Sequence, residues 1–201
     1  MLRCGAGIQL LFFPKVRLSK PHGVPIPMTL LSLRFVLLST IAAQPAPQSI
    51  LDAARAVMQS AEFCFLVTVD DTTEPHARLM QPFPPDEQMR VFLGTNPNSR
   101  KIAQLRKNPR TTLAYYDKAG PNYVTLTGTS RIVDTPSERR KHWRKEWQSF
   151  FPGGPGGPNY TVIEFTPQRI ELISTTHKIA IEPTSPPAII HRTPSGWSTR
   201  K

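Results

Sequence analysis

The sequence has little cysteine, two residues among 201. So little cysteine excludes a disulfide scaffold, and no CxxC or Cys/His spacing indicates a zinc site. The chain also lacks a nucleophile elbow, a P-loop, a metal-binding helix motif and a GxGxxG loop. Its histidines are scattered along the chain, which favours structural roles: His22, His76, His142, His177 and His191. These absences remove the commonest hydrolase, nucleotide and zinc sites.

Acidic residues are missing from the first 44 positions, which hold five bases. The whole chain has 25 basic and 14 acidic residues and a net charge of +11. The part after residue 44 therefore carries 25 − 5 = 20 bases against all 14 acids, or +6. This mixed charge is not the dense basic stripe of a dedicated nucleic-acid binder, so we expect no nucleic-acid partner.

Long hydrophobic runs are also missing. The longest candidate, LLSLRFVLLSTIAA at 30–43, is interrupted by Arg34 and is shorter than the roughly 20 apolar residues of a membrane-spanning helix. We therefore expect no integral membrane span. The run fits a signal peptide that starts at Met28 and is cleaved near Ala43, which would make the protein secreted or periplasmic. An organellar transit peptide, or a disordered extension of a cytoplasmic protein from an upstream start codon, are the alternatives.

Composition divides the chain into three parts. Residues 1–47 are interpreted as the targeting segment or disordered extension with a proline-containing linker. Residues 48–174 form the expected folded domain. Residues 175–201 are rich in Pro, Ser and Thr and are expected to be loosely ordered. The abundant proline, 22 residues, fits both linkers and turns.

Dense or alternating apolar runs predict a series of short strands. The runs are 63–69, 76–81, 89–95, 111–116, 123–134, 160–165 and 169–173. Gly128, inside the longest run, marks an expected bulge or bend. Because no βαβ unit repeats, six or seven such strands predict a mainly β fold with a closed or half-closed antiparallel barrel.

Three helices are expected beside these strands. The first follows Ser49, its expected N-cap, and the second spans 100–107 and is stopped by a proline. The third spans 136–148, begins at a proline, and would place Trp143 and Trp147 on one face.

One segment, GTNPNSRK at 94–101, concentrates groups that bind anions. It runs from a strand end through a turn into a helix N-terminus, where backbone N–H groups are free and the helix dipole is positive. Thr95 and Ser99 add hydroxyls, and Arg100 and Lys101 add charge. The segment therefore predicts a site for a phosphate group.

Two further residues strengthen this prediction. Gly94 would let the backbone approach a ligand closely, and Arg78 on a preceding strand would bring another cation to the same place. A phosphate of charge about −2 accepts several charge-assisted hydrogen bonds. The alternative is that Ser99 is a plain helix cap and that Arg100 and Lys101 are solvated.

These motifs together resemble a known family. EPHARLMQPF, then MRVFLGTNPNSRKIAQLRKNPRTTLAYYD, YVTLTGTSRIVD and the tryptophan-containing segment before FFPGGP follow one another in order over residues 48–174. This arrangement is similar to the FMN-binding split-barrel proteins, the pyridoxamine 5'-phosphate oxidase-like superfamily, and within it to the general stress proteins. The resemblance implies an antiparallel, Greek-key split β-barrel of six to seven strands with a few short helices.

The resemblance also implies a cofactor, FMN, and a homodimer with FMN in the groove between subunits. It assigns the FMN phosphate to Arg78, Ser99, Arg100 and Lys101, with Thr95 near the phosphate or ribityl chain. It places the backbone of Leu79, Met80 and Gln81 beside the isoalloxazine edge. Trp143 and Trp147 are candidate stacking groups, with packing of their helix over the barrel as the alternative. No metal is implied.

The implied function is flavin redox chemistry, with an unidentified small-molecule electron donor or acceptor. The residues that hold pyridoxal phosphate in true pyridoxamine phosphate oxidases are not recognisable after residue 174, which argues against oxidation of vitamin B6. A non-catalytic stress protein that sequesters its flavin is the alternative, because the same residues would serve it. A barrel that binds heme or a phosphorylated metabolite is a third hypothesis.

Overall fold

The computed structural model describes residues 45–182 and 184–200. The expected targeting segment lies almost wholly outside the described residues. Eight strands form one antiparallel sheet: β1 Cys64–Val69, β2 Pro75–Met80, β3 Val91–Thr95, β4 Arg110–Asp117, β5 Asn122–Val133, β6 Thr161–Ile173, β7 Ala188–Thr193 and β8 Gly196–Ser198. The helices are α1 Pro47–Ala61, α2 Arg100–Lys107 and α3 Pro136–Lys141, with short 3-10 turns η1 Lys145–Ser149 and η2 Gly154–Gly156. The predicted mainly β fold is confirmed.

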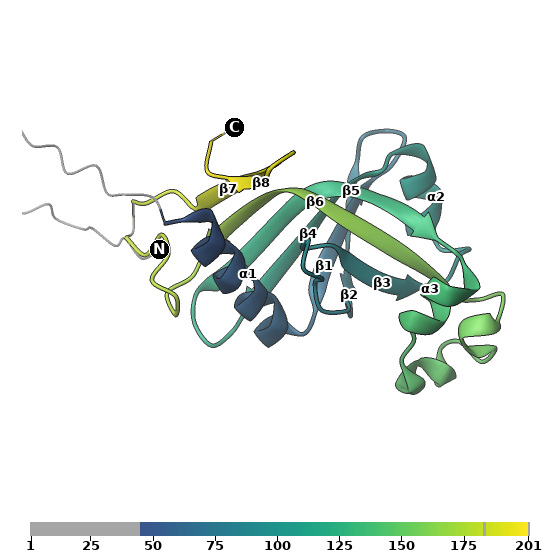
Figure 1. Ribbon diagram of the computed structural model, residues 1–201. Coiled ribbons are helices and arrows are strands. Elements are labelled where there is room, and N and C mark those ends of the chain that lie inside the picture. Colours follow the sequence, from purple (N-terminus) through teal and green to yellow (C-terminus); the bar gives the residue numbers. More distant parts are fainter. Residues whose placement is uncertain (1–44, 183, 201) are drawn as a thin grey trace, which may run out of the picture. The chain divides into compact units, whose positions relative to one another are not determined.

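The strand order shows how the sheet becomes a barrel (Figure 1). β4 pairs with β1, and β1 pairs with β2. β2 continues into residues that bridge β3, where Pro82 is opposite Leu93. β3 then pairs with β6, β6 with β5, and β5 with β4, which closes the circuit. The local order β4-β1-β2-β3 is that of a Greek key, as the family resemblance implies.

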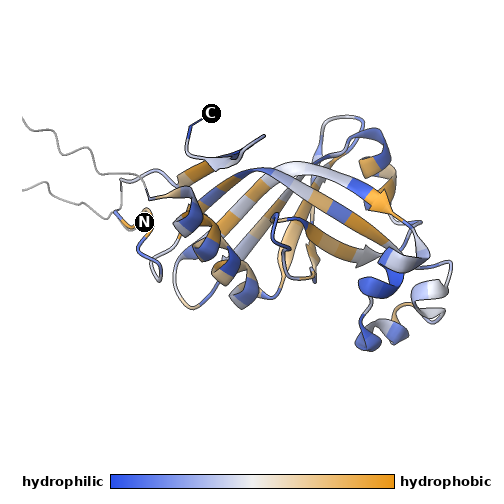
Figure 2. Cartoon of the chain, viewed as in Figure 1, coloured by the Kyte–Doolittle hydropathy of each residue, from blue (hydrophilic) through white to orange (hydrophobic). Residues whose placement is uncertain are grey.

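The alternation of side chains along the strands builds two cores. On β3, Val91 and Leu93 face the main core inside the barrel, while Phe92 faces a smaller aromatic cluster outside it. α1 packs its apolar stripe against β4 and β5 and covers the main core. Figure 2 shows the apolar bands of the strands and of this helix. None of the described helices has the length and apolar character needed to cross a membrane.

β6 is one continuous strand, although the sequence predicts two strands separated at Pro167. Pro167 is opposite Gly128, where the pairing of β5 with β6 shifts register. A Cβ on Gly128 would collide with the backbone of Thr166 and Pro167. The proline is therefore accommodated at a bulge, and the predicted irregularity at Gly128 is confirmed.

The predicted helix at 136–148 is wrong beyond residue 141. The chain leaves α3 at His142, whose carbonyl oxygen accepts a hydrogen bond from the Tyr160 hydroxyl and whose ring stacks on Phe92 at 3.9 Å between centroids. Arg144 donates to the Pro82 carbonyl oxygen, and a separate 3-10 turn follows. These tertiary contacts outweigh the local helical pattern.

The two ends of the described chain also differ from expectation. α1 begins at Pro47, which occupies the first helical turn, and its N-cap residue is Ala46 rather than Ser49. After residue 174, β7 pairs with the second half of β6, and β8 pairs with β7. The structure thus extends the sheet into the segment expected to be loosely ordered, because Ile190 joins the main core.

Candidate functional site

The hairpin of β1 and β2 sets the position of the predicted cation Arg78. Asp70 directly follows β1, and its Oδ1 accepts hydrogen bonds from the Thr72 backbone and hydroxyl and from the Glu74 backbone. Its Oδ2 pairs with His76 at 2.8 Å. The pairing with His76, followed by these turn hydrogen bonds, holds the pKa of Asp70 well below its usual range. This fixed turn places Arg78 opposite Leu66 in the ladder.

Arg78 is half-buried and held by three acceptors. Its Nη1 donates to the Leu66 carbonyl oxygen at 3.2 Å and to the Thr68 hydroxyl at 2.6 Å. Its Nη2 donates to Oε1 of Gln104 at 3.0 Å. The Thr68 hydroxyl in turn donates to the same Gln104 oxygen at 2.6 Å. The guanidinium is thus tied to both β1 and α2.

α2 brings two more cations to Arg78. Lys101 Nζ donates to the Thr95 hydroxyl at 3.0 Å, which links the helix to the end of β3. Burial and then the charge of Arg78 lower the pKa of Lys101, and burial and then the charge of Arg100 lower the pKa of Arg78. The first turn of α2 contains no acidic residue. These positive charges therefore oppose one another.

Ser99 completes the group. It is the N-cap residue of α2, yet its side chain accepts no capping hydrogen bond. Its Oγ is buried and has no hydrogen-bond partner among the described residues. A buried hydroxyl without a partner costs about 1–3 kcal/mol. We call Arg78, Thr95, Ser99, Arg100 and Lys101 the cationic corner, and its donors are those that a phosphate group accepts from.

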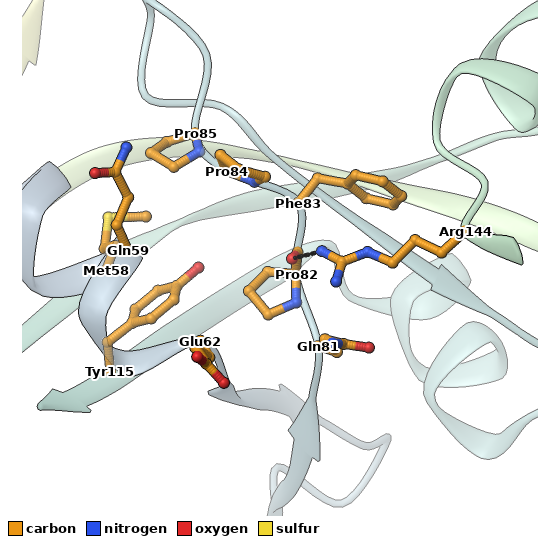
Figure 3. Close-up of a pocket in the computed structure, with 10 residues that line it drawn as sticks. All are labelled: Met58, Gln59, Glu62, Gln81, Pro82, Phe83, Pro84, Pro85, Tyr115 and Arg144. Carbon is orange, nitrogen blue, oxygen red and sulfur yellow. Dashed lines mark hydrogen bonds between the residues drawn. The ribbon is translucent and has the colours of Figure 1, made fainter. Parts of the chain in front are cut away.

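The other half of the predicted site follows β2 away from this corner. Leu79 is opposite Phe65 and Met80 is opposite Cys64. The next residue, Gln81, accepts a hydrogen bond from Trp147 Nε1 at 3.0 Å. Gln81 also lines a pocket of about 390 Å³ between the end of α1 and residues 82–85. Tyr115 and Arg144 also line this pocket, and Figure 3 shows them on different sides of Pro82.

The predicted tryptophans lie in the aromatic cluster outside the barrel. Trp143 and Trp147 meet edge to face at 6.4 Å, but they are not neighbours on one helix. Trp147 packs directly over Gly94, because a Cβ on Gly94 would clash with its ring. Gly94 therefore has a packing role, which differs from the close ligand approach that the sequence suggests. Trp147 thus reaches the predicted site by its packing on Gly94 and by its hydrogen bond to Gln81.

Two residues of the site are missed by sequence reasoning. Thr68 is completely buried in β1, where it resembles any other strand residue. Gln104 lies three residues after Lys101, on the same side of α2. A polar residue at this spacing from a predicted ligand group is a signal, but the Arg78 contact depends on tertiary structure.

The comparison of the sequence with protein families decides the family. The profile of the pyridoxamine 5'-phosphate oxidase family matches residues 50–174. The chain belongs to this family. The matched range begins in α1 and extends through β6, so it contains the whole closed circuit and the cationic corner. No curated protein sequence matches the chain.

Several solved structures have the same fold as this chain. General stress protein 26 of Bacillus anthracis is 23% identical, with a TM-score of 0.55 over 62% of this chain and 93% of that one. A pyridoxamine 5'-phosphate oxidase-related, FMN-binding protein of Nostoc punctiforme is 16% identical, with a TM-score of 0.56 over 78% and 96%. A heme-binding protein of Mycobacterium smegmatis is 16% identical, with a TM-score of 0.51 over 65% and 55%. The chain thus has the split-barrel fold of an FMN-binding family.

Proposed function

We propose that this protein binds FMN, with the phosphate in the cationic corner. The observation that carries the proposal is the buried Ser99 hydroxyl, which has no partner within residues 45–182 and 184–200 and lies at the start of a helix that brings Arg100 and Lys101 towards Arg78. A phosphate dianion would accept a hydrogen bond from Ser99 and offset the repulsion among the cations. Riboflavin, which lacks the phosphate, would leave the Ser99 hydroxyl without a hydrogen-bond partner and the repulsion among the cations without an offsetting charge.

The isoalloxazine ring would follow β2 from this corner. In this proposal the backbone of Leu79, Met80 and Gln81 borders the ring. Trp147 would form the rim through its hydrogen bond to Gln81, with Trp143 packed behind it. The 390 Å³ pocket beside Gln81 would leave room for a second reactant.

We also propose a homodimer, with FMN in the groove between subunits. Phe65 and Leu79 are paired across β1 and β2, yet their side chains are 51% and 59% exposed. Tyr116, 65% exposed, lies on the same outward face of the neighbouring β4. Burial of large apolar side chains in a second subunit would remove this surface from water, directly beside the expected edge of the ring.

The proposed activity is that of a flavin-dependent oxidoreductase. FMN supplies the electron chemistry when bound, and the chain's own residues bind and orient it. Sequestration of flavin without turnover is the alternative, since both functions use the same contacts. Reduction of the bound flavin by NAD(P)H, followed by electron transfer to an added acceptor faster than with free FMN, would distinguish turnover from sequestration.

The binding proposal is tested with purified apoprotein titrated with FMN and with riboflavin. Flavin fluorescence and absorbance report binding of both. We expect saturable binding of FMN and binding of riboflavin at least about tenfold weaker, the loss of one or more charged hydrogen bonds. Equal affinity for the two flavins, no flavin binding, or saturable binding of heme alone would overturn the proposal.

A further inference from the structure

We infer that Gln104 is a positioning residue of the cationic corner: with Thr68, it fixes the Arg78 guanidinium so that one edge remains free for the ligand phosphate. The inference rests on the proposed FMN function and adds to it a residue that need not touch the flavin. The inference follows from which N–H groups of Arg78 already donate hydrogen bonds.

The contacts of Arg78 account for three of its N–H groups. Both Nη1 hydrogens are taken, by the Leu66 carbonyl oxygen and the Thr68 hydroxyl, and Gln104 takes one hydrogen of Nη2. The second Nη2 hydrogen and the Nε–H make no hydrogen bond within the described part of the chain. Neighbouring N–H donors of a guanidinium match two oxygens of a phosphate.

Gln104 is suited to this task because its amide oxygen is a neutral acceptor. The oxygen receives hydrogen bonds from both Arg78 and Thr68 and so joins the three side chains into one unit. A carboxylate there would hold Arg78 too, but would cancel the positive charge that attracts phosphate. An apolar side chain would leave Arg78 free to turn away from Arg100 and Lys101 towards solvent.

The position of Gln104 also connects this unit with the surface. Gln104 and Arg100 line a cavity of about 290 Å³, whose wall also includes His76, Asp70 and Asp71. Arg78 is thus held from both sides, by Leu66 and Thr68 of β1 and by Gln104 of α2. An arginine fixed in this way loses less side-chain entropy when a ligand binds. Gln104 can therefore raise the affinity for the ligand without touching it.

The test compares Gln104→Met with Arg106→Met. Methionine keeps the length of the side chain and removes the acceptor, while Arg106 is an exposed residue of the same helix whose loss lowers the charge of α2. We expect Gln104→Met to weaken FMN binding about tenfold with riboflavin binding unchanged, and Arg106→Met to change both by less than about twofold. In an Arg78→Ala background, Gln104→Met should have no further effect on FMN affinity.

A second measurement does not depend on flavin. NMR of the guanidinium of Arg78 in the apoprotein should show slow rotation of its amino groups in the wild type and in Gln104→Glu, and fast rotation in Gln104→Met. Gln104→Glu should nevertheless bind FMN more weakly than the wild type, because it neutralises Arg78. These results would separate the positioning of Arg78 from the charge of the site.

Three outcomes would overturn the inference. They are unchanged Arg78 rotation in Gln104→Met, FMN affinity of Gln104→Met equal to that of the wild type, or a full Gln104→Met effect that persists without Arg78, since that would mean direct ligand contact. If the wild type binds FMN no better than riboflavin, the proposed function fails instead. The apoprotein NMR then decides the role of Gln104 separately.

Discussion

Gly94 of β3 lies directly beneath the indole ring of Trp147. Because glycine has no side chain, the backbone of β3 contacts the outer aromatic cluster directly. A Cβ on Gly94 would overlap this ring and would come within 2.8 Å of Tyr160 Cε2. Because Trp147 also donates a hydrogen bond to Gln81, this packing connects β3 with the end of β2. Through Trp147, the glycine thereby connects the end of β3, which leads into the cationic corner, with Gln81 at the expected edge of the flavin ring.

Gly94→Ala is accordingly expected to destabilise the fold by about 1–3 kcal/mol, the usual effect of overpacking. Thermal unfolding of the apoprotein measures this loss. Gly156→Ala is the matched control, because a Cβ there meets nothing within 4 Å. Equal and small changes in unfolding temperature for both variants would contradict the packing role of Gly94. They would favour instead the close approach of a ligand that the sequence suggests.

Loss of a corner cation should affect FMN selectively. Arg78→Ala and Lys101→Met should each weaken FMN binding by about 1.5–3 kcal/mol, the value of a hydrogen bond to a charged group, and leave riboflavin binding nearly unchanged. Isothermal titration of both flavins measures the ratio. A parallel loss for FMN and riboflavin would show that these residues support folding rather than phosphate binding.

Lys101→Met should at the same time raise the stability of the apoprotein. Burial and the charge of Arg78 lower the pKa of Lys101, so its charged form opposes folding at neutral pH, where lysine is protonated in the unfolded chain. Urea unfolding without flavin checks this sign. A less stable Lys101→Met apoprotein would mean that the Thr95 hydrogen bond outweighs the electrostatic cost.

The affinity for FMN should depend on pH in two directions. It should rise as pH increases through about 6, where a phosphate monoester gains its second charge. It should fall again at alkaline pH as Lys101 loses its proton, and this fall should begin below the ordinary lysine range because the pKa of Lys101 is lowered in the free protein. Riboflavin affinity, measured over the same pH series, should lack the rise near pH 6; a matching rise would count against phosphate recognition.

The exposed Phe65 and Leu79, paired across β1 and β2, allow the proposed dimer interface to be tested with a new charge. Leu79→Asp should convert a dimer into a monomer, because the side chain is 59% exposed beside Phe65 and would place a carboxylate in the proposed interface. Light scattering after gel filtration measures the mass. Ile181→Asp is the control, since Ile181 is 50% exposed outside the sheet. A wild-type protein that is already monomeric would refute the dimer.

The sequence predicts the parts of this structure that depend on local pattern. Strands β1 to β5, α2 with its proline stop and the irregularity at Gly128 follow from apolar periodicity and turn residues, whereas the continuity of β6 and the strands β7 and β8 do not. The position of the third helix's end does not, because His142 and Arg144 leave the helix to contact Tyr160 and Pro82, which are distant in sequence.

The same distinction applies to the candidate site. The spacing of Ser99, Arg100 and Lys101 is visible in the sequence because one turn and one helix hold all three. The hydrogen bonds that hold Arg78 are not, since Thr68 and Gln104 lie 36 positions apart and meet only when α2 packs on β1. Pairing across the barrel decides such contacts, and no local propensity encodes it.

A crystal structure of the protein grown with FMN tests the central claim most directly. The account predicts the phosphate in the cationic corner, with one oxygen within hydrogen-bond distance of Ser99 Oγ and others at the free edge of Arg78 and at Lys101 Nζ. FMN bound with its phosphate elsewhere, while Ser99 Oγ remains without a partner, would contradict it.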